Sequence, residues 1–265
     1  MEMAMTKVNY GVDDRGVATV TLNNPDKHNA FDDAMIAQLS AAFESAARDS
    51  DVRVLILASE GKSFSAGADL GWMKRMAGYS REENHRDAAA LAQMLKTLNF
   101  MPKPTIARVQ GAAFGGAVGL ISCCDMAIGT LEASFSLSEV RIGLIPATIG
   151  PYVVAAIGQR ASRRYFTTAE RFSAHTALHL GLLGEIVDDS DLDLMINQLV
   201  EQLLGNSPAA LSAAKHLVFD IANREINEEL IDDTCTRIAS IRVSREGQEG
   251  LAAFLEKRSP AWISG

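Results

Sequence analysis

The sequence contains little cysteine and no long apolar run. Its three cysteines, Cys123, Cys124 and Cys235, form neither a CxxC motif nor a zinc-ligand spacing. They therefore predict no disulfide framework and no metal site, and this pattern is typical of a reducing compartment. The uncharged stretch Val109–Cys124 is rich in glycine and falls short of the ~20 apolar residues that a membrane-spanning helix needs.

Positive charge is also scarce. The 265 residues include 25 Lys+Arg against 33 Asp+Glu, which gives a formal net charge of −8. No basic run supplies the local surplus that phosphate backbones require, so we expect no nucleic-acid partner. The first residues carry no apolar signal core and no Arg-rich amphipathic stretch. We therefore expect a cytoplasmic protein with no membrane association.

The N-terminal half alternates strand patterns with helical ones. Val17–Leu22 has β-branched residues at alternate positions, and Val54–Leu57 is the continuous apolar run of a strand buried on both faces. Asp32 is an expected helix N-cap, and Ser80 with Glu83 forms an expected capping box. Further strands are expected at 105–109 and 126–128. This alternation predicts an α/β fold with parallel pairing.

The C-terminal third has a nearly all-helical pattern. Helices are expected at 192–204, 208–223, 227–241 and 244–257. Their apolar faces need a surface to pack on, which is either the core of the same chain or another subunit.

Two segments combine small residues with a position directly after a predicted strand. They are Ser63–Leu70 and Gln110–Gly119. Small residues let a ligand approach the main chain, and free amides at a helix start attract negative charge. Two such loops on neighbouring strands could direct two amides at one oxygen atom, as in an oxyanion hole. The alternative is that their glycines only form tight turns. The spacing fits neither GxGxxG nor a P-loop.

Five segments in order resemble the enoyl-CoA hydratase/isomerase (crotonase) superfamily. They are 23–30 (NNPDKHNA), 64–70 (FSAGADL), 111–116 (GAAFGG), 138–146 (SEVRIGLIP) and 254–258 (FLEKR). The resemblance implies a ClpP/crotonase-like α/β fold, a spiral of ββα units with a helical C-terminal trimerisation region. It implies a core at 1–200 with the CoA site and the active site. It also implies that 201–265 serves oligomerisation and forms a lid over CoA, in a homotrimer or a dimer of trimers.

The same resemblance assigns catalytic roles to three residues. The backbone amides of Ala68 and Gly116 would hold the thioester oxygen of an acyl-CoA, and Glu139 would be the acid/base group. Hydratases of this family typically carry a further glutamate, which would fall at residue 119, where this chain has Gly119. Glu139 would then handle both the water and the proton on the α-carbon, unless another group helps.

CoA contacts are implied as well. The main chain of Ala66, Ala68, Asp69 and Leu70 would contact the adenine, and Lys27 matches a position that approaches the CoA phosphates. Phe254 and Lys257 match residues that reach a neighbouring subunit's CoA. The alternative for both lysines is an ordinary surface position. No metal and no cofactor other than the CoA of the substrate is expected.

The subfamily pattern suggests a substrate. Residues 111–125 and 137–144 are most similar to bacterial methylglutaconyl-CoA hydratases of leucine degradation, which implies hydration of 3-methylglutaconyl-CoA by a lyase. We hypothesise that Arg141 pairs with the distal carboxylate of such a substrate, the alternative being a structural role. Also open are isohexenylglutaconyl-CoA as the substrate, an enoyl-CoA isomerase that uses Glu139 alone, and a non-enzymatic acyl-CoA- or RNA-binding protein.

His175 and His179 have the i, i+4 spacing of metal ligands, but a structural pair is expected.

Overall fold

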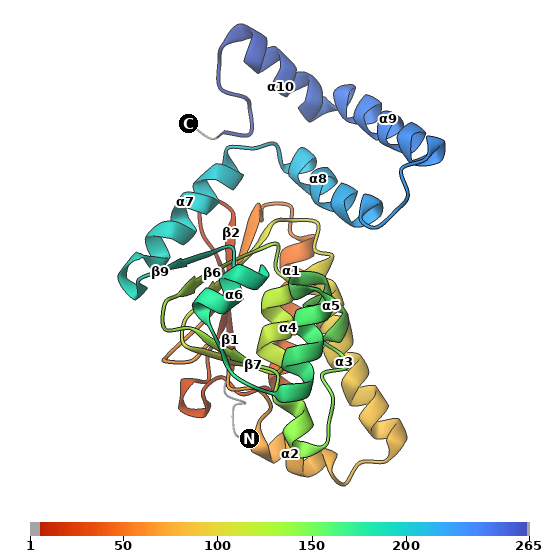
Figure 1. Cartoon of the computed structure of the whole chain (residues 1–265). Coiled ribbons are helices and arrows are strands. Elements are labelled where there is room, and N and C mark those ends of the chain that lie inside the picture. Colours follow the sequence, from red (N-terminus) through yellow and green to blue (C-terminus); the bar gives the residue numbers. More distant parts are fainter. Residues whose placement is uncertain (1–5, 264–265) are drawn as a thin grey trace.

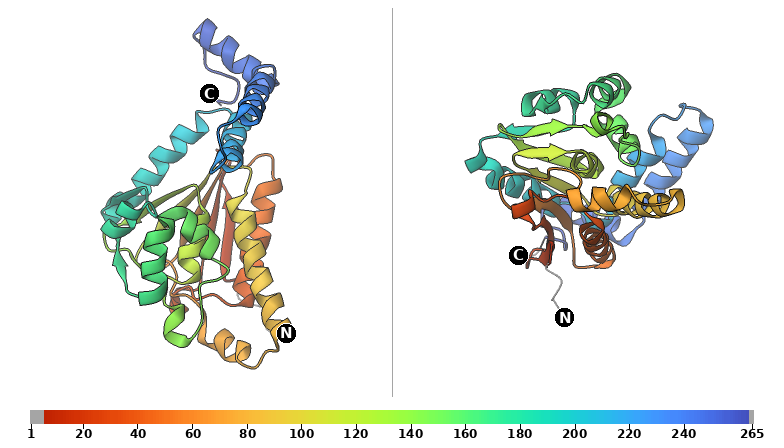
Figure 2. Two further views of the ribbon diagram at one scale, coloured as in Figure 1. Left: turned by 45° about the vertical axis from the view of Figure 1, so that its right-hand side comes forward. Right: turned by 90° about the horizontal axis from the view of Figure 1, so that it is seen from below.

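The computed structural model describes residues 6–263 and has a central six-stranded sheet in the order β1-β2-β3-β4-β6-β9 (Figures 1 and 2). β1 pairs antiparallel with β2, and every later pair in this sheet is parallel. The strands are β1 (Val8–Val12), β2 (Val17–Leu22), β3 (Val54–Ser59), β4 (Thr105–Val109), β6 (Met126–Thr130) and β9 (Glu185–Val187). The predicted parallel α/β core is therefore confirmed.

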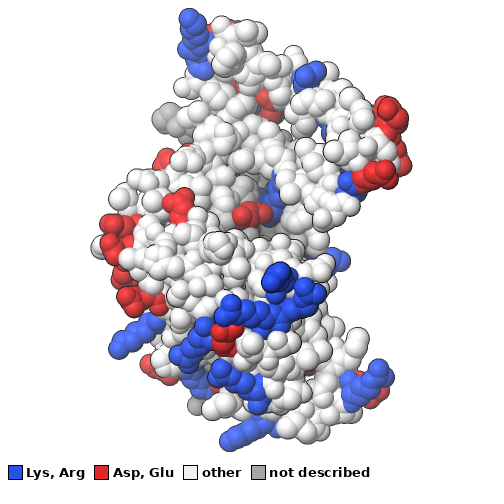
Figure 3. Space-filling view, viewed as in Figure 1, with Lys and Arg blue, Asp and Glu red and all other residues white. Residues whose placement is uncertain are grey.

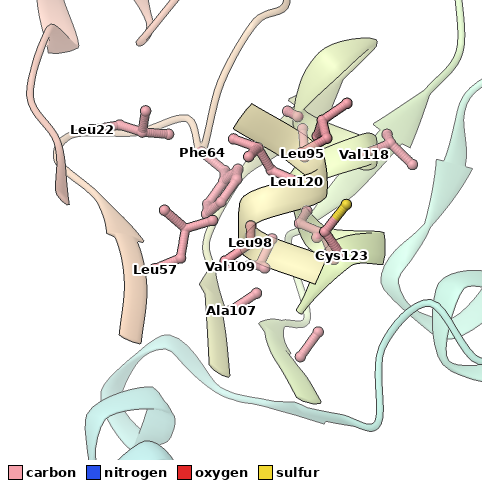
Figure 4. Packing of buried hydrophobic residues seen from close by; sticks show 14 of the residues in the cluster. Leu22, Leu57, Phe64, Leu95, Leu98, Ala107, Val109, Val118, Leu120 and Cys123 are labelled. Atoms are coloured by element: carbon pink, nitrogen blue, oxygen red, sulfur yellow. The ribbon is translucent and has the colours of Figure 1, made fainter. Parts of the chain in front are cut away.

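Hydrophobic residues cover both faces of the sheet. In β3 all six residues are buried, and alternate side chains belong to different clusters. Leu55 and Leu57 pack in the larger cluster with helices α1 (Asp33–Arg48) and α3 (Arg81–Asn99). Figure 4 shows Leu57 and Val109 of the sheet, Leu95 and Leu98 of α3, and Phe64 in this cluster. The opposite face packs against α7 (Leu192–Leu204). Burial on both faces explains why β3 is an uninterrupted apolar run.

The predicted helix starts are confirmed. Asp32 Oδ1 accepts a hydrogen bond from Met35 N at 2.9 Å, and α1 begins at the next residue. Ser80 and Glu83 form the reciprocal capping box of α3. Each cap satisfies amide groups that the helix itself leaves without acceptors.

A second, three-stranded sheet was not predicted from the sequence. Its order is β5-β7-β8, and its strands are β5 (Ala112–Phe114), β7 (Ser134–Ser136) and β8 (Phe172–Ser173). The helices near it are α4 (Gly116–Cys123), α5 (Gly150–Thr168) and α6 (Ala174–Leu180). Another helix, α2 (Leu70–Met76), follows the first small-residue loop.

The last three helices lie at one end of the molecule, away from the main sheet (Figures 1 and 2). They are α8 (Pro208–Ile221), α9 (Glu228–Arg242) and α10 (Arg245–Glu256), and their bounds agree with the predicted helices to within about two residues. Among the described residues after Gly205, only Leu230 and Ala253 are buried hydrophobic residues. Lys215 joins α8 to the core through Asp125 Oδ2 at 2.8 Å, and its side chain is 9% exposed.

No helix in residues 6–263 is both long enough and apolar enough to span a membrane. The net negative charge is unevenly distributed: on the face seen in Figure 3, Lys and Arg side chains gather in the lower half. Exposed arginines lie at positions 160, 163 and 164 of α5 and at position 171, directly before β8. A local positive surface is therefore present on a chain of net charge −8.

Candidate active site

The first small-residue loop is fixed beside Phe31. Phe31 N donates to Gly67 O at 2.7 Å, and Asp69 N donates to Phe31 O at 2.7 Å. This pairing leaves the amide of Ala68 between the two bonds, and within the described residues it donates to no acceptor. Ala66 and Ala68 are both exposed. The loop therefore presents a free amide at an accessible position directly after β3.

The second loop presents another free amide. Gly115 N donates to Ser136 O at 2.9 Å, and Gly115 has φ +55° and ψ −118°, a backbone conformation that favours glycine. Gly116 begins α4, so its amide has no acceptor within the helix. No other described residue accepts from it. The helix N-terminus adds a partial positive charge at this point.

The two loops are joined by main-chain hydrogen bonds. Ser65 N donates to Ala112 O at 3.0 Å, and Phe114 N donates to Ser65 O at 2.9 Å. Phe31 is a second link between the two amides. Its backbone pairs with Ala68, and its ring lies against Gly116, since a Cβ added to Gly116 would be 3.4 Å from Phe31 Cδ2. The sequence prediction that these loops are neighbours is confirmed.

Glu139 lies beside the second loop. It begins the short 3-10 helix η2 (Glu139–Ile142) and is half-buried. A Cβ on Gly115 would stand 3.2 Å from its Oε1, so the carboxyl is next to the residue that precedes Gly116. Its Oε2 is buried and has no hydrogen-bond partner in the described part of the chain. Burial raises the pKa of this carboxyl, because the charged form is poorly solvated.

Lys27 and Asp69 form an ion pair at the edge of the first loop. Lys27 Nζ is 2.9 Å from Asp69 Oδ2, and the Lys27 side chain is 59% exposed. The lysine lowers the pKa of Asp69, which also caps α2 by accepting from Trp72 N at 3.0 Å. Leu70 is 74% exposed. The predicted CoA-contacting residues thus lie together around this ion pair, where Lys27, Ala66, Ala68 and Leu70 are exposed and Asp69 is buried.

Phe254 and Lys257 belong to a different part of the molecule. Phe254 lies in α10 and is 81% exposed, and Lys257 caps that helix with φ +56°. Figure 1 shows α10 at the end of the molecule opposite α2. Within one chain the structure does not bring these residues to the loops. Their role at a neighbouring subunit's CoA stays a prediction.

Arg141 makes a structural contact, which fits the alternative considered for it, and Gly119 has a neighbour that the sequence did not predict. Arg141 Nη2 donates to Ala169 O at 2.7 Å, which ties η2 to the end of α5. Gly119 faces Ile149, and a Cβ at residue 119 would lie 2.2 Å from Ile149 Cγ2. Sequence reasoning missed Ile149, since no local pattern links two residues 30 positions apart.

The remaining candidates have no catalytic geometry. Burial raises the pKa of the Cys123 and Cys124 thiols, which makes both poor nucleophiles. His175 and His179 share α6, but residues 6–263 contain no cluster of three or more His, Cys, Asp or Glu side chains that could hold a metal ion.

Comparisons with known proteins match this architecture. The family model described as enoyl-CoA hydratase/isomerase covers residues 13–265. An enoyl-CoA hydratase from Shewanella pealeana is 49% identical with a TM-score of 0.95, over 98% of this chain and 97% of the other. One from Mycobacterium smegmatis is 35% identical with a TM-score of 0.91, over 98% and 100%. A hydroxycinnamoyl-CoA hydratase-lyase of Pseudomonas fluorescens is 35% identical over 205 residues, 76% of this chain and 74% of that protein. These similarities confirm the predicted crotonase-type α/β fold.

Proposed function

Since the chain belongs to the enoyl-CoA hydratase/isomerase family, whose members act on acyl-CoA substrates, we propose that it hydrates the C2=C3 double bond of an enoyl-CoA. The proposed substrate is 3-methylglutaconyl-CoA or a related branched glutaconyl-CoA. The observation that carries the proposal is the half-buried Glu139, whose buried Oε2 has no hydrogen-bond partner among the described residues and whose Oε1 lies beside Gly115, the residue before the Gly116 amide.

The two free amides supply the electrostatic part of the proposed reaction. Water attacks C3 of the enoyl thioester, and negative charge develops on the thioester oxygen as an enolate. The amides of Ala68 and Gly116 donate to that oxygen. Removing one donor from such a site typically costs about 3–4 kcal/mol of transition-state stabilisation.

Glu139 supplies the proton transfers. Its carboxylate accepts a proton from the attacking water as the oxygen bonds to C3, and it then gives that proton to C2 of the enolate. The product gains one H and one OH from a single water, and Glu139 returns to its ionised form. One carboxylate on one face therefore suffices, and both groups add to the same face of the double bond.

The raised pKa of Glu139 suits both halves of this cycle. A carboxyl with a raised pKa is a stronger base towards water, and it holds the proton more firmly until C2 accepts it. Because the reaction starts from the ionised form, we expect kcat/KM to rise with pH through the pKa of Glu139, which lies above the ordinary glutamate value.

The distal carboxylate of the proposed substrate needs a cationic partner. Arg141 is the hypothesised partner, although its Nη2 is already bound to Ala169 O. Arg141→Ala tests the pairing: KM for 3-methylglutaconyl-CoA should rise at least tenfold while KM for crotonyl-CoA stays the same. An equal change for both substrates means that Arg141 only supports the end of α5.

A second candidate function is isomerisation. The single carboxylate favours it, since one base can remove a proton from C2 of a 3-enoyl-CoA and return it to C4. The two reactions have opposite optical signatures: hydration removes the absorbance of the conjugated enoyl thioester, and isomerisation of a 3-enoyl-CoA creates it. Loss of absorbance with 3-methylglutaconyl-CoA supports the hydratase, and a gain with a 3-enoyl-CoA alone supports the isomerase.

Glu139→Gln tests the assigned base. We expect the hydration rate to fall by about 10²–10⁴-fold, the usual range for loss of a general acid/base. Glu132→Gln, at an exposed glutamate seven residues away, is the matched control and should keep full activity. Full activity in Glu139→Gln would refute the assignment. A wild-type protein that turns over no enoyl-CoA, binds acyl-CoA and shifts RNA in a gel would instead be the non-enzymatic binding protein.

We further propose that the protein assembles as a homotrimer or a dimer of trimers. The support is the set of exposed apolar side chains on the last three helices, which include Val218, Phe219, Ile238, Leu251, Phe254 and Leu255. Such surfaces are typical of interfaces between subunits. Light scattering measures the mass directly, and a monomer would refute the assembly.

A further inference from the structure

Two glycines at the start of α4 face two different side chains. Gly115 is the N-cap residue of α4 and has a non-helical backbone, with φ +55° and ψ −118°, and Gly119 lies four residues later, about one helical turn along the chain. A Cβ at 115 would meet Glu139 Oε1 at 3.2 Å, whereas a Cβ at 119 would meet Ile149 Cγ2 at 2.2 Å. Glu139 therefore lies beside the N-cap of α4, and Ile149 lies beside its first turn.

The direction of a helical side chain adds to this picture. Each Cα–Cβ bond in a helix tilts towards the N-terminus. A side chain at residue 119 would therefore extend back towards Gly115 and the Glu139 carboxyl. Ile149, which is 2% exposed, occupies the start of that path.

We propose that Ile149 keeps this active site to a single carboxylate, by filling the space in which a side chain at residue 119 would stand beside Glu139. Ile149 is then a specificity-determining residue: it decides how many acid/base groups the site can hold. The catalytic part of the inference rests on the proposed role of Glu139, whereas the steric part stands without it.

The geometry specifies which substitution opens the space. Rotation of the Ile149 side chain moves Cγ2 but not Cβ, and Ile149 Cβ is itself only 2.7 Å from the Cβ position at 119. Alanine at 149 therefore leaves the obstruction in place. Glycine removes it, since the Ile149 Cα is 3.6 Å away, an ordinary contact distance. The backbone of residue 149 has φ −85° and ψ −19°, which any residue adopts without strain.

The steric part is tested by thermal unfolding of Gly119→Ala in three backgrounds: wild type, Ile149→Ala and Ile149→Gly. We expect Gly119→Ala to lower Tm in the first two. In the Ile149→Gly background it should raise Tm, because the added methyl group finds space and alanine is a better helix former than glycine. Ile149→Ala is the matched control for cavity formation. An equal change of Tm in all three backgrounds would overturn the proposal, whatever reaction the enzyme catalyses.

The catalytic part is tested by rescue. The triple variant Glu139→Gln/Gly119→Glu/Ile149→Gly carries its only carboxylate of the pair at residue 119. It should hydrate crotonyl-CoA at least tenfold faster than Glu139→Gln/Gly119→Gln/Ile149→Gly, which carries a carboxylate at neither position. With Glu139 intact, Gly119→Glu/Ile149→Gly should add a second ionisation to the pH–rate profile, because two carboxyls this close perturb each other's pKa. Equal rates for the two triple variants would refute the catalytic part. Inactivity of the wild type towards every enoyl-CoA would refute the proposed function, and the Tm result would still decide the steric part.

Discussion

Glu139→Gln should make the protein more stable at neutral and alkaline pH while it removes activity. The Glu139 carboxyl has a raised pKa because it is buried, and its Oε2 has no partner in the described part of the chain. A carboxyl whose folded-state pKa lies above the unfolded value favours the folded state at low pH. That contribution is lost as pH rises through the folded-state pKa and the buried group must ionise. Glutamine has nearly the same shape and carries no charge.

The size of the effect follows from the unpartnered oxygen. A buried polar atom without a partner costs about 1–3 kcal/mol, and more when it is charged. Glutamine keeps a polar group at the same place, so the substitution should remove only part of this destabilisation. We expect the free energy of unfolding to increase by about 1 kcal/mol at pH 8. For a chain of this length that corresponds to an increase in Tm of roughly 2–4 °C. Below about pH 4, where glutamate is protonated even in the unfolded chain, the difference should vanish.

Differential scanning fluorimetry of the wild type and Glu139→Gln between pH 4 and pH 8 is a direct assay. Glu132→Gln at an exposed site serves as the control and should follow the wild type at every pH. An unchanged or lower Tm for Glu139→Gln at pH 8 would refute the reasoning. An increase of the same size at every pH would also contradict it, since that would point to packing rather than ionisation.

Gly111→Ala should destabilise the protein by about 3 kcal/mol in urea denaturation, because Gly111 has φ +63° and its Cβ would lie 1.9 Å from a backbone oxygen. Gly11→Ala, where no atom lies within 4 Å, should change stability by less than ~0.5 kcal/mol. Asp69→Ala should cost about 0.5–2 kcal/mol through loss of the α2 cap. The folded-state pKa of Asp69 is lowered, so the stability lost in Asp69→Ala should shrink as pH falls through that folded-state pKa. Lys215→Ala should cost about 1–2 kcal/mol and speed proteolysis near residues 205–207, since it removes the nearly buried lysine that bonds Asp125, whose Oδ2 keeps its hydrogen bonds from Thr105.

Local sequence signals predicted the main sheet and its helices because those elements follow from side-chain pattern alone. The strands at 17–22 and 105–109 have the predicted bounds, since their apolar and β-branched residues are buried on the sheet. The capping box at Ser80 and Glu83 needs only four consecutive residues to be recognised. Both kinds of signal act within a few positions of the chain.

Features that depend on long-range contact could not be predicted in this way. The second sheet has strands of two or three residues, too short for a period-2 pattern, and pairs 112–114 with 134–136. Within α5 the chain is kinked at Gly158, whose φ of +76° and ψ of +161° are not helical, and no local pattern predicted that two helical stretches meet there. In the site, the residue types at 68, 116 and 139 could be recognised, whereas the obstruction of Gly119 by Ile149 exists only after folding.

The hydrogen bonds between Ser65 and the strand that precedes Gly115 have a consequence for how this site tolerates mutation. The two amides proposed to stabilise the enolate are positioned by main-chain pairing, so most side-chain substitutions in either loop leave those amides in place. The proposed proton chemistry, by contrast, depends on one side chain at residue 139 and on the space around it. Under the proposed mechanism, enolate stabilisation is robust to most point mutations, whereas the fate of the proton can change with one or two substitutions. A lineage built on this backbone can acquire new reactions without rebuilding its oxyanion-binding groups.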